Sequence, residues 1–316
     1  MEESKTVVFA AIAANLAIAA MKFVAAALSG SSAMLSEGIH SLVDTGDGVL
    51  LWVGMVRGKK PPDRTHPFGH GKELYFWTLI VGVLIFAVGG GMSAYEGIIH
   101  LLNPRPAHHG NWIYLVLAGS FAFEGGSWLF AWRNFKRERA GRGIWETISS
   151  SKDPSSFAIL FEDSAALAGL VMAALGVWLS QRLGTPIPDA VASIVIGAIL
   201  MVTAGLLVQA TLRLIVGESA DPETVAGIRR AAAEDAAVRG VGRILTVHFG
   251  PENIVAQIEL FFARDLGAEE VAQAIDRIQR RLKSEEPMLK HIFIEAEASP
   301  PPARGVPPRP RAAVAR

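Results

Sequence analysis

Four ionisable residues lie close together in a stretch of the chain that is otherwise apolar enough to cross a bilayer. His40 and Asp44 are four residues apart within residues 34–56, and Glu37 and Asp47 lie on the same face of the expected helix. A charged side chain in the membrane costs about 2.5–3.5 kcal/mol on insertion scales, so it is retained where it meets an ion, a partner or water. An imidazole and a carboxylate four residues apart can ligate one metal ion. We interpret this stripe as part of a metal pathway.

The remaining ligands of such a site must come from another helix. Asp163, near the start of the fifth apolar stretch, is the first candidate, and its neighbour Glu162 is the second. Adjacent helical residues diverge by about 100°, so both can ligate one ion only if the helix is distorted or the ion lies off its axis. We expect Glu37 to be solvated near the outer end of its helix, and Asp47 to be a vestibule residue or a hydrogen-bond partner between helices. Direct coordination of the ion by either residue stays an alternative. Other polar residues in apolar stretches are scattered: Asn15, Glu96, Glu124, Asp189 and Gln209.

A second group of potential metal ligands lies in a polar loop. Asp63, His66 and His70 are spaced as D-x-x-H-x-x-x-H, which places three nitrogen and oxygen donors in one short segment. Histidines in a polar loop are usually solvated, but these three donors are able to close on one ion. The chain contains no cysteine, so any metal site in it must use nitrogen and oxygen ligands.

The composition predicts a polytopic membrane protein embedded in the lipid bilayer. Hydrophobic residues make up 51% of the chain and charged residues only 19%, and the mean hydropathy is +0.33. A hydrocarbon core of roughly 30 Å requires about 20 apolar residues per helix. Six stretches satisfy this requirement: 6–28, 33–56, 74–102, 112–133, 157–181 and 187–210. The first is long enough to span and lacks a cleavable-signal pattern, so we expect it to stay as a helix.

The loop charges predict the orientation of these helices. Basic residues are concentrated in two loops: Arg57, Lys59, Lys60, Arg64 and Lys72 in the first, and Arg133, Lys136, Arg137, Arg139, Arg142 and Lys152 in the second. The other loops contain only Arg105 and Arg182. By the positive-inside rule both basic loops face the cytoplasm. We therefore expect an inner (cell) membrane protein with both termini cytoplasmic. No nucleic-acid partner is expected.

The chain is expected to divide into residues 1–217, which form the six-helix transmembrane domain, and a soluble domain over 218–297. Asp221 and Pro222 predict a helix start. Strands are predicted at 243–249 and 254–262, a second helix at 268–283 and a last strand at 291–296. The order α-β-β-α-β predicts a small α+β domain. Residues 298–316 are rich in proline and arginine and are expected to be disordered.

At this point the chain resembles the cation diffusion facilitator family of proton-coupled divalent metal transporters. The matching residues are the H-x-x-x-D of His40 and Asp44 with the preceding Leu35-Ser36-Glu37, the loop sequence H-P-F-G-H-G-K, Asp163, and an α-β-β-α-β domain ending in Ile292-Phe293-Ile294-Glu295. The resemblance covers roughly residues 6–297. It implies a homodimer joined through the cytoplasmic domains, alternating access to one transport site per protomer, and a loop site at Asp63, His66 and His70.

Two features depart from the usual family pattern. The fifth apolar stretch normally carries H-x-x-x-D, but Ile159 stands four residues before Asp163, so Glu162 or a water is expected to complete the site. In the C-terminal domain the usual metal-binding positions are not obviously filled. His248, His291, Glu295 and Glu297 are the donors available there, and an ordinary strand surface explains them equally well.

The expected function is efflux of a divalent cation in exchange for protons. Zn²⁺ is the leading substrate and a possible ion of the loop site, while Mn²⁺, Fe²⁺, Co²⁺ and Cd²⁺ are alternatives for an oxygen-rich site. Metal binding needs neutral imidazole and ionised carboxylates, so metal and protons compete for the same ligands. No organic cofactor and no enzymatic activity are expected. An intramembrane hydrolase normally carries H-E-x-x-H, which is absent, and a passive channel would leave His40 without a role.

Overall fold

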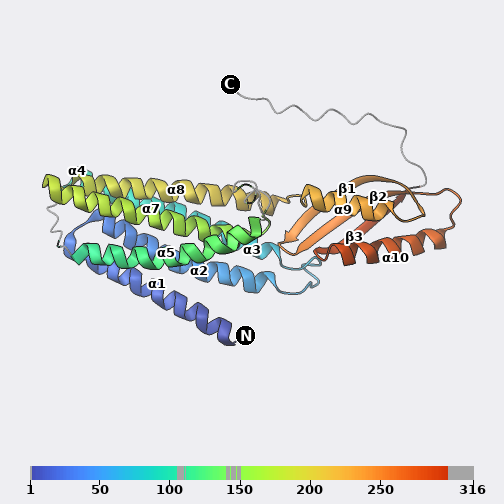
Figure 1. The fold of residues 1–316 in the computed structure, drawn as a ribbon, viewed down its shortest axis with the longest axis horizontal. Coiled ribbons are helices and arrows are strands. Elements are labelled where there is room, and N and C mark those ends of the chain that lie inside the picture. The colour runs from blue at the N-terminus through green and yellow to red at the C-terminus, as the bar shows by residue number, and fades with distance from the viewer. Residues whose placement is uncertain are drawn as a thin grey trace, which may run out of the picture. The chain divides into compact units, whose positions relative to one another are not determined.

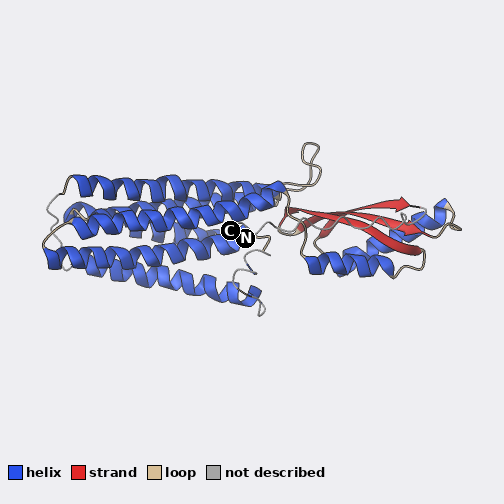
Figure 2. Ribbon diagram, turned by 90° about the horizontal axis from the view of Figure 1, so that it is seen from above, coloured by secondary structure: helices blue, strands red, loops and turns tan. Residues whose placement is uncertain are grey.

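The computed structural model describes residues 2–104, 110, 112–139, 143, 147 and 151–297. It divides into two compact units, Met1–Gly217 and Glu218–Arg316 (Figure 1). Figure 2 shows that the first unit consists of helices and that the second combines strands with helices. The expected disordered tail, 298–316, lies outside the described residues.

The first unit contains long helices joined by short connections. The described elements are α1 (Glu2–Ser29), α2 (Ser32–Gly58), α3 (Lys72–Leu84), η1 (Ile85–Gly91), α4 (Met92–Leu102), α5 (Trp112–Arg139), α7 (Pro154–Leu183) and α8 (Ile187–Val216). Because α3, the π-helical segment η1 and α4 are continuous, they form one helical path. Together with α1, α2, α5, α7 and α8, it accounts for the six predicted helices.

Four of these six helical paths are both long and apolar enough to cross a membrane. They are Lys72–Leu102, Trp112–Arg137, Phe157–Leu183 and Ile187–Val216, each of 26 to 31 residues. Within the described part of α1 the apolar segment is Asn15–Ser29. Helix α2 has 27 residues but carries the ionisable groups noted above, which lower its hydropathy. The predicted fold class, a helical polytopic membrane protein with a C-terminal α+β domain, is confirmed.

Glycines allow α8 to pack closely against η1 and α4. A Cβ atom added to Gly90 would lie 2.9 Å from the carbonyl oxygen of Gly197, and one added to Gly197 would lie 2.7 Å from the carbonyl oxygen of Gly90. A Cβ at Gly97 would lie 2.7 Å from the carbonyl oxygen of Ala190. Small residues at these positions therefore bring the two helical paths into backbone contact, as is common in membrane helix pairs.

Asp189 joins the start of α8 to the start of α2. Its Oδ1 accepts a hydrogen bond from Ser31 Oγ at 2.7 Å, and its Oδ2 accepts one from the Ser32 backbone nitrogen at 2.6 Å. Ser31 also caps α2 by accepting from the Met34 backbone nitrogen. Asp189 is 1% exposed. Its carboxylate thus satisfies backbone and hydroxyl donors at a buried helix N-terminus.

The second unit is a three-stranded sheet covered by two helices. Its elements are α9 (Pro222–Ala233), β1 (Val238–Gly250), β2 (Asn253–Phe262), α10 (Ala268–Glu285) and β3 (Leu289–Glu297). The sheet order is β1-β2-β3, with β1 antiparallel and β3 parallel to β2. The core forms where Ile228 of α9 and Ile278 of α10 pack with Ile258 of β2. The predicted order α-β-β-α-β is present, although β1 begins five residues earlier than expected because it includes Val238–Gly242.

Candidate metal centre

Helix α2 places His40 and Asp44 side by side in the interior of the first unit. His40 Nδ1 lies 3.3 Å from Asp44 Oδ1. The imidazole is 1% exposed, whereas the Asp44 side chain is 16% exposed. Within the described chain, neither ring nitrogen of His40 has a hydrogen-bond partner, and neither does Asp44 Oδ1. Three nitrogen and oxygen donor atoms are therefore buried on one turn of α2 without a hydrogen bond in the described chain, and two of them contact each other.

Helix α7 presents Glu162 and Asp163 to the same region. Asp44 interacts electrostatically with both of them. Glu162 Oε1 is buried without a hydrogen-bond partner among the described residues. Asp163 Oδ2 accepts a hydrogen bond from Ser127 Oγ of α5 at 2.8 Å. Ser127 therefore fixes the orientation of one candidate ligand. No motif pointed to this residue, because its contact with Asp163 joins two different helices.

Asp47 also belongs to this acidic region. It is fully buried, and neither of its carboxylate oxygens has a hydrogen-bond partner in the part of the chain that the structure describes. It interacts electrostatically with Asp44 on its own helix and with Glu162 on α7. Its surroundings therefore differ from those of a carboxylate that serves only as a hydrogen-bond partner between helices.

The described donor atoms of α2 and α7 face the same region but do not form a compact group of three. No three histidine or carboxylate ligand atoms from α2 and α7 lie within 4.8 Å of one another among the described residues. Ile159, which occupies the position where the family pattern has histidine, is 43% exposed. The described donors of α2 and α7 therefore do not form a closed three-ligand group.

Lys22 of α1 is a functional candidate that sequence reasoning missed, although it is the only charged residue within 6–28. Its Nζ lies 3.1 Å from Glu37 Oε2 and 3.7 Å from Glu124 Oε1. It donates a hydrogen bond of 2.7 Å to Ser41 Oγ. The expectation that Glu37 is solvated is wrong, because this residue is fully buried and paired with Lys22. Glu124 belongs to the same network.

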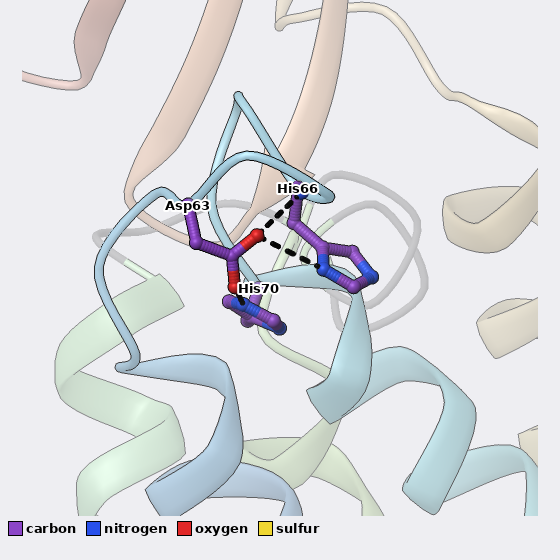
Figure 3. A group of neighbouring side chains, drawn as sticks. All are labelled: Asp63, His66 and His70. Atoms are coloured by element: carbon purple, nitrogen blue, oxygen red, sulfur yellow. Dashed lines mark hydrogen bonds and ion pairs between the residues drawn. The ribbon is translucent and has the colours of Figure 1, made fainter.

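The loop between α2 and α3 holds its three predicted ligands together. Figure 3 shows Asp63 between the two histidines. Asp63 Oδ2 lies 3.0 Å from His70 Nε2, and Asp63 Oδ1 lies 3.5 Å from His66 Nδ1. One ligand atom from each residue fits within a 4.8 Å group. Gly69, with φ of +85°, allows the tight turn that brings His70 back towards Asp63.

Hydrogen bonds within the loop also define its electrostatics. Asp63 Oδ1 accepts from the backbone nitrogen and the hydroxyl of Thr65, at 2.8 and 2.7 Å, and from the backbone nitrogen of His66 at 2.7 Å. The Thr65 hydroxyl, His70 and the His66 backbone hold the pKa of the Asp63 carboxyl well below its usual range. An ionised carboxylate beside two imidazoles fits a divalent cation such as Zn²⁺.

The donors of the second unit do not form a comparable group. No set of three ligand atoms from His248, His291, Glu295 and Glu297 meets the same 4.8 Å limit in the described residues. Glu295 instead accepts a hydrogen bond from Gln257 Nε2 at 3.4 Å. His248 is 2% exposed and its ring lies against the carbonyl oxygen of Gly250. These contacts are those of an ordinary sheet.

Comparison with known proteins identifies the family. A family model described as the cation efflux transmembrane domain matches residues 8–216. The chain belongs to the cation diffusion facilitator family. Members of this family are transporters rather than enzymes.

Several relatives of this cation diffusion facilitator match most of the chain. The human proton-coupled zinc antiporter SLC30A9, mitochondrial, is 32% identical over 92% of this chain and 58% of its own length. Metal tolerance protein C4 of Arabidopsis thaliana is 30% identical over 83% of this chain and 58% of its own length. The manganese efflux system protein MneP of Bacillus subtilis is 23% identical over 92% of this chain and 95% of its own length. The chain thus spans less than three fifths of the length of the first two.

Proposed function

We propose that this protein exports a divalent cation, with Zn²⁺ as the main substrate, through a site formed by His40, Asp44, Glu162 and Asp163. The observation that carries the proposal is the set of buried donor atoms on α2 and α7 without hydrogen-bond partners in the described chain. Unsatisfied buried polar atoms are unfavourable, and a cation that accepts their lone pairs offsets that cost. Family membership supports the same conclusion.

The donor chemistry supports Zn²⁺ and leaves defined alternatives. One imidazole and three carboxylates make an oxygen-rich set, which suits Zn²⁺ and also Mn²⁺, Fe²⁺, Co²⁺ and Cd²⁺. The human relative is named as a zinc antiporter and the Bacillus relative as a manganese efflux protein. Glu162 takes the role of fourth ligand in this proposal, because Ile159 offers no donor atom and Glu162 Oε1 is unsatisfied among the described residues.

Proton exchange follows from the same ligands. His40 must be neutral and the carboxylates ionised to hold a metal ion, so protons and metal displace one another. The human relative is named as proton-coupled. We infer that metal loads from a neutral cytoplasm and that protons displace it on the opposite side.

The proposed setting is the cell membrane, with both termini in the cytoplasm. The two basic loops carry most of the loop lysines and arginines, and the positive-inside rule places them in the cytoplasm. The connection between α2 and α3 is one of them, so the Asp63, His66 and His70 group faces the side from which metal would load. This group would hold a second ion, through two imidazoles and one carboxylate.

We also propose a homodimer, because one face of the sheet in the second unit exposes two large apolar side chains. Leu245 of β1 and Phe293 of β3 are each 52% exposed. Both pair with Gln257 of β2, so they lie on the same face of the sheet. A second copy of the chain would cover this face. Leu245→Glu should convert a dimer to a monomer in light scattering, and an unchanged mass would contradict this assignment.

The test of the transport proposal is metal flux in proteoliposomes. We would compare Zn²⁺, Mn²⁺, Fe²⁺, Co²⁺ and Cd²⁺ with and without a pH gradient, for the wild type and for Asp163→Ala. Gradient-driven Zn²⁺ flux that is lost in Asp163→Ala is the expected result. Absence of flux for every metal would overturn the transporter, while flux that ignores the gradient would overturn the exchange with protons.

A further inference from the structure

A buried cation lies beside the proposed transport site. Lys22 is fully buried, and it is the one buried lysine or arginine among the residues whose burial the structure describes. Its ammonium group contacts Glu37 and Ser41 on α2 and lies near Glu124 on α5. The consecutive helices α1 and α2 and the more distant α5 therefore meet at one positive charge.

Helix α7 also contacts Glu37, through the uncharged residue Gly169. A Cβ atom placed on Gly169 would collide with Glu37 Oε1. Glycine at this position therefore leaves the room that the Glu37 carboxylate occupies. The same helix carries Glu162 and Asp163 two turns earlier, so Glu37 is held in place by the helix that supplies the second half of the proposed site.

The Lys22 network and the proposed site influence one another electrostatically. Lys22 acts on both His40 and Asp44. Glu124, which neighbours Lys22, acts on Asp44 and Asp163. A cation bound between α2 and α7 would therefore experience repulsion from Lys22 as well as attraction from the carboxylates.

A purely structural ion pair would be expected to satisfy all of its polar atoms. Glu37 accepts from Lys22 through Oε2, but its Oε1 is buried with no hydrogen-bond partner in the described residues. An incompletely satisfied buried pair is a poor source of stability, because desolvation of both charges is only partly offset. The arrangement is better explained by the effect of its charge on neighbouring groups.

We propose that Lys22 is a resident cation of the transport site, which offsets the surrounding carboxylates and so sets how tightly a divalent cation binds and how readily it leaves. Lys22 is a positioning residue and does not ligate the metal. Its ammonium repels the transported ion enough to permit release from a strongly acidic site. This inference rests on the proposed function.

The test compares the KM and kcat of Zn²⁺ flux in proteoliposomes for variants that change this charge in opposite directions. Lys22→Gln should lower KM about tenfold and also lower kcat, because a site with one positive charge fewer binds the ion more tightly and releases it more slowly. Glu37→Gln should raise KM about tenfold, because Lys22 then keeps only the more distant Glu124 carboxylate as a counter-charge. The double variant should return KM to within about threefold of the wild type.

Glu96→Gln is the matched control, because Glu96 is a carboxylate of α4 that pairs with His100 within its own helix. It should leave KM and kcat unchanged. A merely structural ion pair predicts that both single variants shift KM in the same direction, and that result, or no shift in either, would overturn the proposal. If Lys22→Gln does not fold, Glu37→Gln and the double variant still decide it. A wild type without flux would overturn the proposed function instead.

Discussion

The two groups of potential metal ligands differ in whether their donor atoms are already satisfied. In the loop, Asp63 accepts three hydrogen bonds through Oδ1 and contacts His70 through Oδ2. In the membrane unit, His40, Asp44 and Glu162 each have at least one buried donor atom without a partner in the described chain. The loop group can keep its shape without an ion. In the proposed function, an ion completes the membrane group.

This difference has an energetic consequence. An unsatisfied buried polar group costs about 1–3 kcal/mol, so the membrane donors are unfavourable until something binds them. The loop is half-exposed, and water competes for its ligand atoms. A site that must bind and release its ion in every cycle benefits from a high-energy empty state. A site that holds one ion for long periods benefits from a preformed one. We therefore assign transport to the membrane group and ion retention to the loop.

The largest effect should come from Asp44→Asn, which keeps the shape of the side chain and removes its charge. Loss of a partner outside the first ligand shell already costs up to about 100-fold in metal affinity, so loss of a ligand should reduce Zn²⁺ flux by at least about 100-fold. Flux in proteoliposomes measures this. Asn103→Asp, which changes a residue after α4, is the control for protein yield and insertion. Flux within a few-fold of wild type for Asp44→Asn would contradict the assignment.

The next effect distinguishes the two candidates for the fourth ligand. Glu162→Gln should reduce Zn²⁺ flux about tenfold, because it removes one charged donor and leaves an amide in its place. Ile159→Ala is the matched variant on the same helix and should transport normally, because the Ile159 side chain is substantially exposed and carries no donor atom. Equal flux for both variants would remove Glu162 from the site.

The sequence alone predicted the parts of the molecule that depend on local pattern. Hydropathy located the helices, and the alternation of strand and helix signals located the second unit. The spacing of His40 and Asp44 predicted their contact, because residues four apart on a helix must share a face. The loop group was predicted for a similar reason, since its three residues are close in sequence.

Contacts between distant segments could not be predicted in this way. The sequence analysis missed Lys22, because its pairing with Glu37 depends on how α1 packs against α2. The room that Gly169 leaves for Glu37 depends on α7. The role of Asp189 at the start of α2 could not be predicted either, because its partners Ser31 and Ser32 are more than 150 residues away in the sequence. Tertiary packing determined each of these roles.

A smaller effect should follow from Gly169→Ala, which displaces the Glu37 carboxylate without changing any charge. Overpacking of this kind costs about 1–3 kcal/mol. Because Glu37 then pairs less well with Lys22, we expect KM for Zn²⁺ to rise about fivefold with little loss of protein. Gly126→Ala is the matched control, since a Cβ there meets nothing within 4 Å. An equal change in KM for both variants would indicate a general effect of alanine.

The loop group should respond differently from the membrane group. Asp63→Asn removes the one carboxylate of the loop, so the protein should lose a bound Zn²⁺ ion per chain in equilibrium dialysis. Zn²⁺ flux at saturating metal should change by less than about threefold, because a solvent-exposed group contributes little to a step inside the membrane. Asp265→Asn, in the connection between β2 and α10, controls for loss of a surface charge. Loss of flux as severe as that in Asp44→Asn would mean that the two groups act as one pathway.

The smallest effect concerns the pH dependence of the loop. The folded pKa of Asp63 lies below its ordinary value, first because of the Thr65 hydroxyl and then because of His70. A carboxyl with a lowered folded pKa stabilises the fold above its unfolded pKa of about 3.9, and this contribution is lost as pH falls through the folded pKa. The loop should therefore keep its arrangement at pH values where an ordinary aspartate is already protonated. Thr65→Val should raise the midpoint of Asp63 titration, followed by carboxyl carbon NMR, whereas Thr224→Val should not. An unchanged midpoint in Thr65→Val would show that the Thr65 hydroxyl does not stabilise the ionised Asp63 carboxylate. That result would contradict the prediction that the loop is preformed.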